Sequence, residues 1–437
     1  FVKTLFEGVK MLAKVLELKL RRLGIHYGWV IAFLAFLTTM FSSATLSIPQ
    51  VLVIPLTESF GWQISDVTTS IAVMYVVLAS IAPFGGAMML RLGIPKVVII
   101  SVSFSVLGLL TTALSFEKWH LVMSIGLCLG VSSGILGLGL NATVATRWFV
   151  KKRGLVVGIL TAAFAAGQLT FLPAMAWIVT NYDWRLAIIP CLIGSALCGI
   201  LFLLFGKSWP ADLDLPPLGD KEIYNPPKQT TDGAIHISFS YLFEAMKYPI
   251  FWMLAGTFFI CGLTSTGIVG QHFIPFCADN NVGIIAASSY LAIMGIFNFV
   301  GTMTSGWLSD RFDNYTLLAS YYGLRGVSLI FLPYSDFDVF DLTLWAIFFG
   351  LDYIATVPPT VRLTSAAFGV IKGPVVFGWI FAAHQFGSAF AAYGAGVSRV
   401  SLLSYLPAFL VAGLFCFVAV FVIFFFKFTK VKTAVAS

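Results

Sequence analysis

Two charged residues interrupt the long apolar stretches of this sequence, and they are the residues best suited to chemistry there. Arg325 and Asp352 lie in the consecutive apolar runs Leu317–Leu332 and Leu342–Val361. An unpaired charge inside hydrocarbon is costly, so we expect the two side chains to pair with each other. The pair is either a fixed structural contact or a site for substrate or a proton. A proton role requires Asp352 to leave Arg325 in one state, because a close cation favours the ionised carboxylate.

Neutral polar side chains also occur near the middle of apolar runs, at His384, Gln385, Gln168 and Asn298. In hydrocarbon such groups need hydrogen-bond partners, so they either face a water-filled cavity or bond to a neighbouring helix. His384 is the strongest candidate for contact with substrate, because it lies deep and can change charge near neutral pH. We predict substrate binding by these four residues together with Tyr353.

Arg362 and Arg147 lie just beyond the ends of two apolar runs. As cations they could attract an organic anion, although binding to lipid headgroups is the more common use of such positions. Pro358 and Pro359 remove two amide donors from the tenth run and predict a kink there. Broken helices often flank binding sites in membrane proteins.

The elements that must hold these residues are helices that cross a membrane. Hydrophobic residues make up 59% of 437 positions, charged residues 10%, and the mean hydropathy is +0.94, which excludes a water-soluble protein. Twelve apolar runs are long enough to cross, so we predict an all-α membrane protein with two six-helix bundles. The runs are Trp29–Ile54, Val67–Leu90, Val97–Ser115, Leu121–Thr146, Gly154–Ile178, Leu186–Phe205, Ile250–Phe276, Ile285–Leu308, Leu317–Leu332, Leu342–Val361, Val375–Val397 and Leu402–Phe426.

The runs divide the chain into two halves. Residues 207–249 are rich in proline and charge and lack helical periodicity, which predicts a linker between one bundle at 27–206 and another at 250–427. Residues 1–26 have the pattern of an amphipathic helix on the membrane surface, with a frayed tail as the alternative. Residues 428–437 are predicted to be a second tail.

Basic residues predict the orientation of these helices. If both termini and residues 207–249 lie in the cytoplasm, 22 of the 26 Lys and Arg residues fall on that side and three on the other, with Arg325 inside a span. The positive-inside rule favours this arrangement. The net charge of +7 therefore indicates membrane orientation and not nucleic-acid binding.

Other side chains give no sign of an enzyme or a cofactor. Six cysteines occur singly in or beside apolar runs, without the spacing of a metal site, so we predict that they are packing residues. We find no nucleotide-binding loop, HExxH motif or GxSxG elbow, and we predict neither a cofactor nor a metal. The cysteines are Cys128, Cys191, Cys198, Cys261, Cys277 and Cys416.

A shift of 220 positions places the second half of the chain on the first. Matches at one offset, in corresponding runs, predict two related units around an axis along the membrane normal, as in parallel-repeat transporters. The matching pairs are Pro55 and Pro275, Gly86 and Gly306, Arg91 and Arg311, Gly130 and Gly350, and Gly167 and Gly387.

Two of the connections resemble the cytoplasmic-loop motif of the major facilitator superfamily. The connection after the second run reads Gly86-Ala-Met-Met-Leu-Arg91-Leu-Gly93, with Leu90 where the motif usually has an acid, and the connection after the eighth reads Gly306-Trp-Leu-Ser-Asp310-Arg311. The resemblance implies that both copies contribute to a cytoplasmic gate. The implied gate residues are Gly86, Arg91, Gly93, Gly306, Asp310 and Arg311.

Three further stretches resemble bacterial members near the monocarboxylate porters and oxalate/formate exchangers. They are His26-Tyr-Gly-Trp29, Arg147-Trp-Phe-Val-Lys-Lys-Arg-Gly154 and Gly350-Leu-Asp-Tyr-Ile-Ala-Thr-Val-Pro-Pro-Thr360. The resemblance covers residues 27–426 and implies a monomeric secondary transporter of the bacterial inner membrane, with lipid as a further partner. It implies alternating access for a small organic anion, first a monocarboxylate, moved with a proton or in exchange.

Other functions stay open at this point. The run Ile285–Leu308 holds no Asp or Arg, whereas porters of the animal monocarboxylate branch carry both there. Uptake of a carboxylate-type siderophore and export of a drug-like compound are therefore alternatives. A channel or a membrane receptor also fits the hydropathy, although the two-half repeat favours a transporter.

Overall fold

The structure is helical throughout the part of the chain that it describes. The computed structural model describes residues 2–62, 64–223 and 233–429. Within these residues the strand geometry is limited to one isolated bridge, between Phe149 and Leu218. Helices suit a membrane interior because they satisfy the backbone hydrogen bonds within one segment. The chain divides by its contacts into two compact units.

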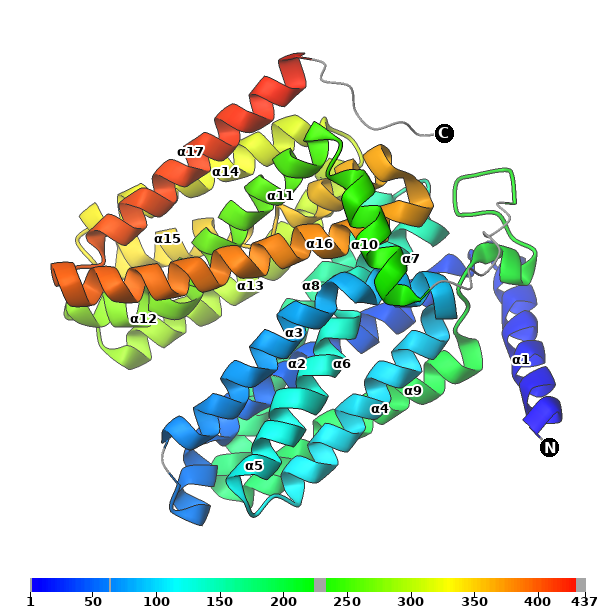
Figure 1. Cartoon of the computed structure of the whole chain (residues 1–437), viewed down its shortest axis with the longest axis horizontal. Coiled ribbons are helices and arrows are strands. Elements are labelled where there is room, and N and C mark those ends of the chain that lie inside the picture. Colours follow the sequence, from blue (N-terminus) through cyan, green and yellow to red (C-terminus); the bar gives the residue numbers. More distant parts are fainter. Residues whose placement is uncertain (1, 63, 224–232, 430–437) are drawn as a thin grey trace. The chain divides into compact units, whose positions relative to one another are not determined.

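The first unit comprises residues 1–151 and 163–238. Within it α3 packs against α6, and α4 packs against α9 (Figure 1). Its helices are α1 (Val2–Arg22), α2 (Gly28–Phe60), α3 (Ile64–Leu92), α4 (Ile94–Ala113), α5 (Lys118–Leu121), the π-helical η1 (Val122–Leu129), α6 (Gly130–Leu136), α7 (Gly139–Trp148), the later part of α8 (Arg153–Asn181), the short η2 (Trp184–Ile188), α9 (Ile189–Phe205) and η3 (Pro210–Leu213).

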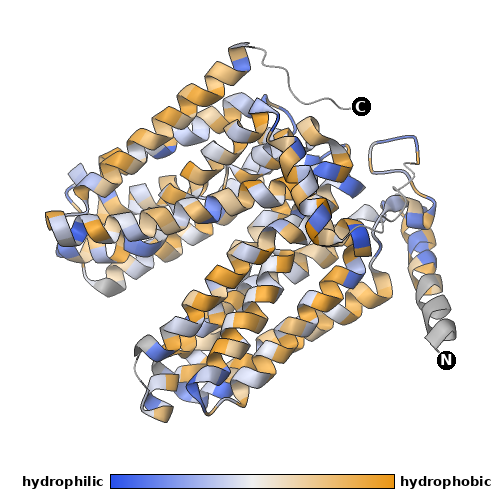
Figure 2. Ribbon diagram, viewed as in Figure 1, coloured by the Kyte–Doolittle hydropathy of each residue, from blue (hydrophilic) through white to orange (hydrophobic). Residues whose placement is uncertain are grey.

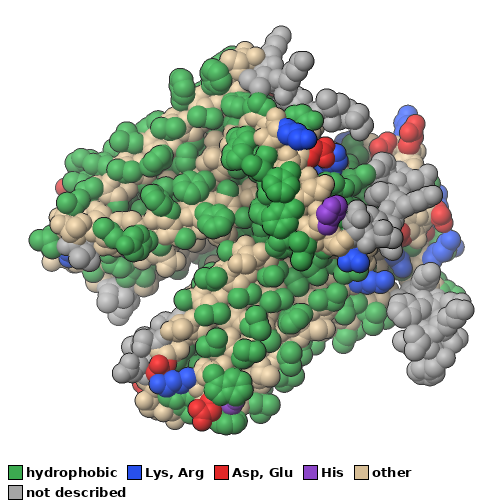
Figure 3. Space-filling view, in the orientation of Figure 1, with side chains coloured by type: hydrophobic (Ala, Val, Ile, Leu, Met, Phe, Trp, Pro, Cys, Tyr) green, Lys and Arg blue, Asp and Glu red, His purple; other side chains and the backbone are tan. Residues whose placement is uncertain are grey.

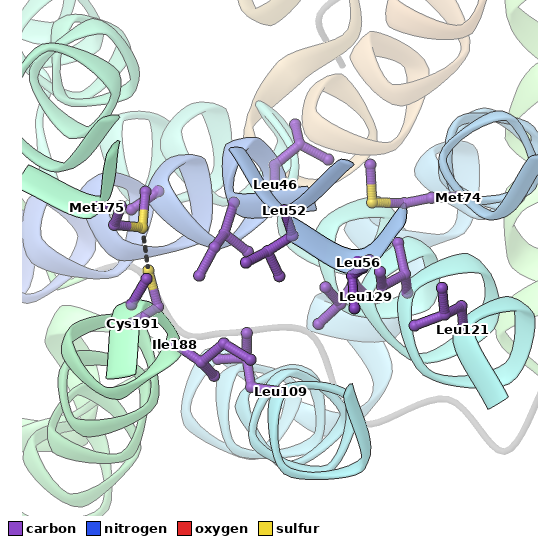
Figure 4. Packing of buried hydrophobic residues seen from close by; sticks show 14 of the residues in the cluster. Leu46, Leu52, Leu56, Met74, Leu109, Leu121, Leu129, Met175, Ile188 and Cys191 are labelled. Carbon is purple, nitrogen blue, oxygen red and sulfur yellow. Dashed lines mark hydrogen bonds between the residues drawn. The ribbon is translucent and has the colours of Figure 1, made fainter. Parts of the chain in front are cut away.

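Leucine side chains fill the core of the first unit. Figure 4 shows Leu52 and Leu56 of α2 among side chains from the surrounding helices, including Leu129. At one side of this cluster the Cys191 Sγ lies 3.6 Å from the Met175 Sδ. The prediction that Cys191 packs as a small apolar residue is therefore confirmed.

The second unit comprises residues 152–162 and the chain from Phe239 onward. Within it α11 packs against α16, α13 against α15, and α14 against α17 (Figure 1). The helices of this part of the chain are α10 (Ala234–Ala245), α11 (Pro249–Gly262), the π-helical η4 (Leu263–Val269), α12 (Gly270–Asp279), α13 (Ile284–Ser309), α14 (Asn314–Phe331), η5 (Leu332–Tyr334), α15 (Val339–Asp352), α16 (Val357–Leu402) and α17 (Leu406–Thr429).

Ten segments of the described chain are long and apolar enough to cross a membrane. One of them, Val339–Arg399, has 61 residues, whereas one crossing needs about 20, and the left-handed Gly369 interrupts it, so it holds two crossings. The 18-residue α14 is less apolar because it carries Arg325, yet it packs along α17. With two crossings in that segment and with α14 added, the described chain has twelve membrane helices. The predicted fold of twelve membrane helices is therefore confirmed. Figure 2 shows hydrophobic residues along most of their length.

The internal repeat is visible in how the helices begin and pack. The first residues of α3 and α13 correspond under the repeat shift, and so do those of α4 and α14. A Cβ atom on Gly130 would lie 2.9 Å from the Met74 carbonyl oxygen, and one on Gly350 would lie 2.6 Å from that of Met294. These contacts match under the same shift, so both glycines allow the same close helix approach.

The segment between the two halves differs from the prediction. We expected residues 207–249 to lack helical structure, but α10 forms there. Apolar residues at 235, 239, 243 and 246 have helical spacing, which the prolines before them obscured. At the other end of the chain the expected helix α1 is present, and its contact with a membrane stays a prediction because the side chains of residues 1–10 lie outside the described ones.

Candidate functional site

Arg325 and Asp352 contact each other in the interior of the second unit. The Arg325 Nε donates to the Asp352 Oδ2 over 2.6 Å, and both side chains are buried. Arg325 comes from the middle of α14, and Asp352 is the last residue of α15. The structure therefore brings together the two charged residues of the apolar runs.

The same guanidinium group also caps a broken helix. The Arg325 Nη2 lies 2.5 Å from the carbonyl oxygen of Asp352 and 3.1 Å from that of Tyr353. The last carbonyls of a helix lack intrahelical partners and carry partial negative charge, so a cation there is favourable. Helix α16 then begins at Val357, with Pro358 and Pro359 in its first turn. The predicted interruption near these prolines is confirmed, because proline is tolerated only where no amide donor is needed.

Cys261 of α11 joins the guanidinium group to other polar side chains. The Arg325 Nη1 lies 3.2 Å from the Cys261 Sγ and 3.4 Å from the Thr264 Oγ1. The Cys261 Sγ is also 3.2 Å from the Thr356 Oγ1, and it interacts with the His384 imidazole. The prediction that Cys261 is an apolar packing residue was wrong, since this thiol belongs to a polar network. The signal in the sequence was its spacing from Thr264 and Ser265, three and four residues further along one helix face.

Two atoms of this network are open to a further hydrogen bond. Among the described residues, the Asp352 Oδ1 and the His384 Nδ1 are buried and have no hydrogen-bond partner. The His384 ring centroid lies 5.0 Å from that of Phe258 and 5.8 Å from that of Phe381. Buried polar atoms are nearly always paired, so a carboxylate oxygen and an imidazole nitrogen left open here are suited to a proton or a ligand.

Three of the four remaining predicted binding residues lie outside this network. Asn298 is buried on α13 and accepts a hydrogen bond of 3.1 Å from Thr302 of its own helix. Gln168, which belongs to the first unit, donates to the Ser47 Oγ over 3.3 Å. Gln385 is half-buried beside His384, and Tyr353 enters the network through its carbonyl oxygen.

The first unit has serines at the positions that correspond to the charged pair. Under the repeat shift Ser132 corresponds to Asp352, and Ser105 corresponds to Arg325. The Ser132 Oγ is 3.0 Å from the Ser101 Oγ, and the Ser105 Oγ is 3.4 Å from the Ser195 Oγ. Neutral hydroxyl groups therefore join the corresponding helices in one repeat, so this fold does not require an ion pair at that place.

Comparison with known proteins identifies the family. Residues 31–392 match the Major Facilitator Superfamily. The chain belongs to this superfamily. It is a secondary transporter and not an enzyme.

The relatives within the superfamily are distant. Monocarboxylate transporter 13 of Rattus norvegicus is 26% identical over 407 residues, which covers 89% of this chain and 86% of the relative. The uncharacterized MFS-type transporter YcxA of Bacillus subtilis is 24% identical over 390 residues, covering 84% and 88%.

Solved structures of the superfamily share the fold. The proton:xylose symporter XylE, bound to 6-bromo-6-deoxy-D-glucose, has a TM-score of 0.71 at 14% identity and covers 92% of this chain and 96% of its own. The E. coli fucose:proton symporter FucP has a TM-score of 0.69 at 15% identity, with coverage of 91% and 99%.

The second copy of the superfamily loop motif caps a helix through Asp310. Its Oδ1 accepts from the Gly154 N–H and its Oδ2 from the Leu155 N–H, each over 2.8 Å, within the second unit. These amides begin α8, where a carboxylate is favourable. Arg362 forms an ion pair with the same carboxylate. We expected Arg362 to attract an anion, and in this structure its guanidinium group is paired with the Asp310 carboxylate.

Other motif residues and Arg147 have local partners. Arg311 lies over the Trp307 ring at 3.9 Å, Arg91 is exposed, and Gly86 is buried within α3. Arg147 is buried, with its guanidinium carbon 4.2 Å from the Trp209 ring centroid. An anion therefore has no open access to Arg147 in this conformation.

Close contacts with neighbouring atoms require glycine at positions 93 and 306. Gly93 has a φ of +83°, and a Cβ on it would lie 2.4 Å from the Ser208 Oγ, which accepts from the Ile94 N–H over 3.0 Å. A Cβ on Gly306 would lie 2.5 Å from the Gly154 carbonyl oxygen, within the second unit. Only glycine fits both positions without a shift of the neighbouring atoms.

Gly306→Ala is expected to lower the thermal stability of the purified protein. Overpacking of this kind costs typically about 1–3 kcal/mol. Gly256→Ala is the matched control, because a Cβ there meets nothing within 4 Å, and alanine should stabilise that helix by up to about 1 kcal/mol. Thermal unfolding in detergent measures both. Equal midpoints for the two variants would contradict the close contact at Gly306.

Proposed function

We propose that this transporter moves a small organic anion by alternating access, with a monocarboxylate as the first choice, coupled to a proton or to exchange. The observation that carries the proposal is the buried Arg325–Asp352 pair, which one repeat contains and the other replaces with serines. A charge pair that the fold does not need supports a role in transport. Relatives named monocarboxylate transporters support the choice of substrate.

Arg325 must change partners before it can bind an anion. An arginine has five N–H donors, and here they are directed to the Asp352 carboxylate, the Cys261 and Thr264 side chains, and the carbonyls of Asp352 and Tyr353. A proton on the open Asp352 Oδ1 would neutralise the carboxylate and release the Nε. The substrate carboxylate would then take the place of Asp352.

The charge balance favours proton and anion moving together. The ion pair is neutral, so adding an anion alone or a proton alone leaves one net charge in a low-dielectric site. Adding both restores neutrality. In this proposal His384 stands near the substrate and offers its Nδ1, while Gln385, Gln168, Asn298 and Tyr353 supply neutral hydrogen bonds from their respective units.

The same proposal includes orientation and assembly. The protein is placed in a bacterial inner membrane as a monomer, with both termini and residues 207–249 in the cytoplasm, which the 22 basic residues on that side support. The loops that hold Gly93 and Asp310 are assigned to the cytoplasmic gate. The ion pair of Arg362 with Asp310 supports this assignment, since it strengthens the cap on α8.

Uptake into proteoliposomes tests the function. With labelled L-lactate outside, an inward gradient of 1 pH unit is expected to support about tenfold accumulation, because one pH unit corresponds to about 1.4 kcal/mol. Unlabelled lactate inside, at equal pH, should accelerate entry if the coupling is exchange. Liposomes without protein are the control. Uptake that responds neither to the gradient nor to internal lactate would contradict proton-coupled or exchange transport of this monocarboxylate.

A further inference from the structure

The linker helix α10 exposes a stripe of large apolar side chains. Ile235 is 65% exposed and Phe243 is 61% exposed, and the stripe continues over Phe239 and Met246. Spacings of four, four and three residues place these side chains on one side of the helix. Figure 3 shows hydrophobic side chains gathered over this helix on the near face. A contiguous exposed patch of this kind indicates a surface that something covers.

Polar residues follow the stripe around the exposed arc of α10. His236 and Ser240 are exposed and lie next to the stripe in the helical order, and Lys247 is exposed in the turn that follows the helix. The opposite side packs inward, where Ile237 and Ala245 are buried. Glu244 holds the helix to α16 through an ion pair with Lys372 at 2.5 Å. The exposed arc therefore has an apolar half and a polar half, and the turn after it adds a basic residue.

The stripe continues onto the surface of a membrane-spanning helix. Trp252 lies in the first turn of α11, is 54% exposed, and donates from its Nε1 to the Met246 carbonyl oxygen over 2.9 Å. The membrane-spanning segment Pro249–Asp279 begins just before Trp252. Tryptophan is enriched where a span meets the lipid headgroups. The apolar half of α10 thus adjoins the level at which the bilayer begins.

We propose that α10 lies in the membrane–water interface and binds the bilayer surface. Ile235, Phe239 and Phe243 enter the boundary of the acyl chains, and Lys247 and His236 lie among the headgroups, where basic groups favour anionic lipid. The apolar stripe is continuous with the surface of α11, and polar residues border it on the exposed side of α10. Both observations favour lipid, and not another protein, as what covers the stripe. This interface would hold the linker to the membrane whichever substrate is carried.

Spin labels on the full-length protein test this position. One nitroxide is placed by Phe243→Cys on the apolar half and a matched one by Ser240→Cys on the polar half, in a Cys128→Ser background, because Cys128 is the one cysteine among the described residues that is not buried. The variants are placed in nanodiscs of phosphatidylcholine and phosphatidylglycerol at 3:1. Accessibility to oxygen and to a water-soluble nickel complex is measured by power saturation.

The expected result is that the Phe243→Cys label is several-fold more accessible to oxygen than to the nickel complex, with the opposite ratio for the Ser240→Cys label. Preferential access of the nickel complex to both labels would overturn the proposal, since the helix would then lie in water. Protection of the Phe243→Cys label from both reagents would also overturn it, because a protein surface would cover the stripe. Transport by each labelled protein establishes that it is folded.

Discussion

Replacing Arg325 and Asp352 together with serine is expected to give a protein that folds but has lost about 100-fold of its uptake rate. The substitution copies Ser105 and Ser132 of the first unit, whose hydroxyl groups bond to Ser195 and Ser101, respectively. A 100-fold loss corresponds to about 2.7 kcal/mol. Uptake of labelled L-lactate into proteoliposomes and thermal unfolding of the same preparation measure the two effects.

The single variants are expected to behave differently from the double one. Arg325→Ser leaves the Asp352 carboxylate buried without its cation, whereas the double variant removes both charges. Breaking a buried ion pair from one side costs about 3–5 kcal/mol, so this variant should unfold at a much lower temperature than the double variant. Full uptake by the double variant would show that the pair is structural. A double variant as unstable as Arg325→Ser would show that this unit needs the charges to fold.

Features with a strong physical constraint could be predicted from the sequence. A charge inside hydrocarbon needs a partner, and the chain offers Arg325 and Asp352 on consecutive spans, so their contact was expected and the structure contains it. The twelve spans could be predicted from hydropathy. The repeat could be predicted because glycines that let helices approach closely recur at the same shift in both halves. Each of these signals depends on residue type and spacing alone.

Other features depend on tertiary partners that the sequence does not reveal. Asn298 and Gln168 have the same polarity as a cavity residue, yet a hydroxyl on their own or a nearby helix satisfies each of them. Arg362 pairs with Asp310, which lies far from it in the sequence, so its position beyond a span suggested a free cation. Cys261 shares a helix face with Thr264 and Ser265, but its contact with Arg325 depends on the packing of another helix.

His384→Ala is expected to weaken binding of the substrate by about tenfold to 100-fold, with little loss of stability. The Nδ1 has no hydrogen-bond partner to lose, and the Cys261 thiol that interacts with the imidazole keeps its contacts with Arg325 and Thr356. A hydrogen bond to a charged group contributes about 1.5–3 kcal/mol, which corresponds to this range. The ring is half-buried between Phe258 and Phe381, so part of the space it leaves is open. Isothermal binding of L-lactate and the KM for uptake measure the effect.

His272→Gln is the matched control on the neighbouring helix α12. The His272 Nε2 lies 2.8 Å from the Ala392 carbonyl oxygen of α16, so this histidine joins two helices and has its partner within the protein. We expect the substitution at His272 to lower the unfolding temperature and to leave affinity unchanged, the reverse of the pattern for His384→Ala. An unchanged affinity in His384→Ala would remove His384 from the binding site. The Arg325–Asp352 pair would then be the part of the proposed network left to bind the anion.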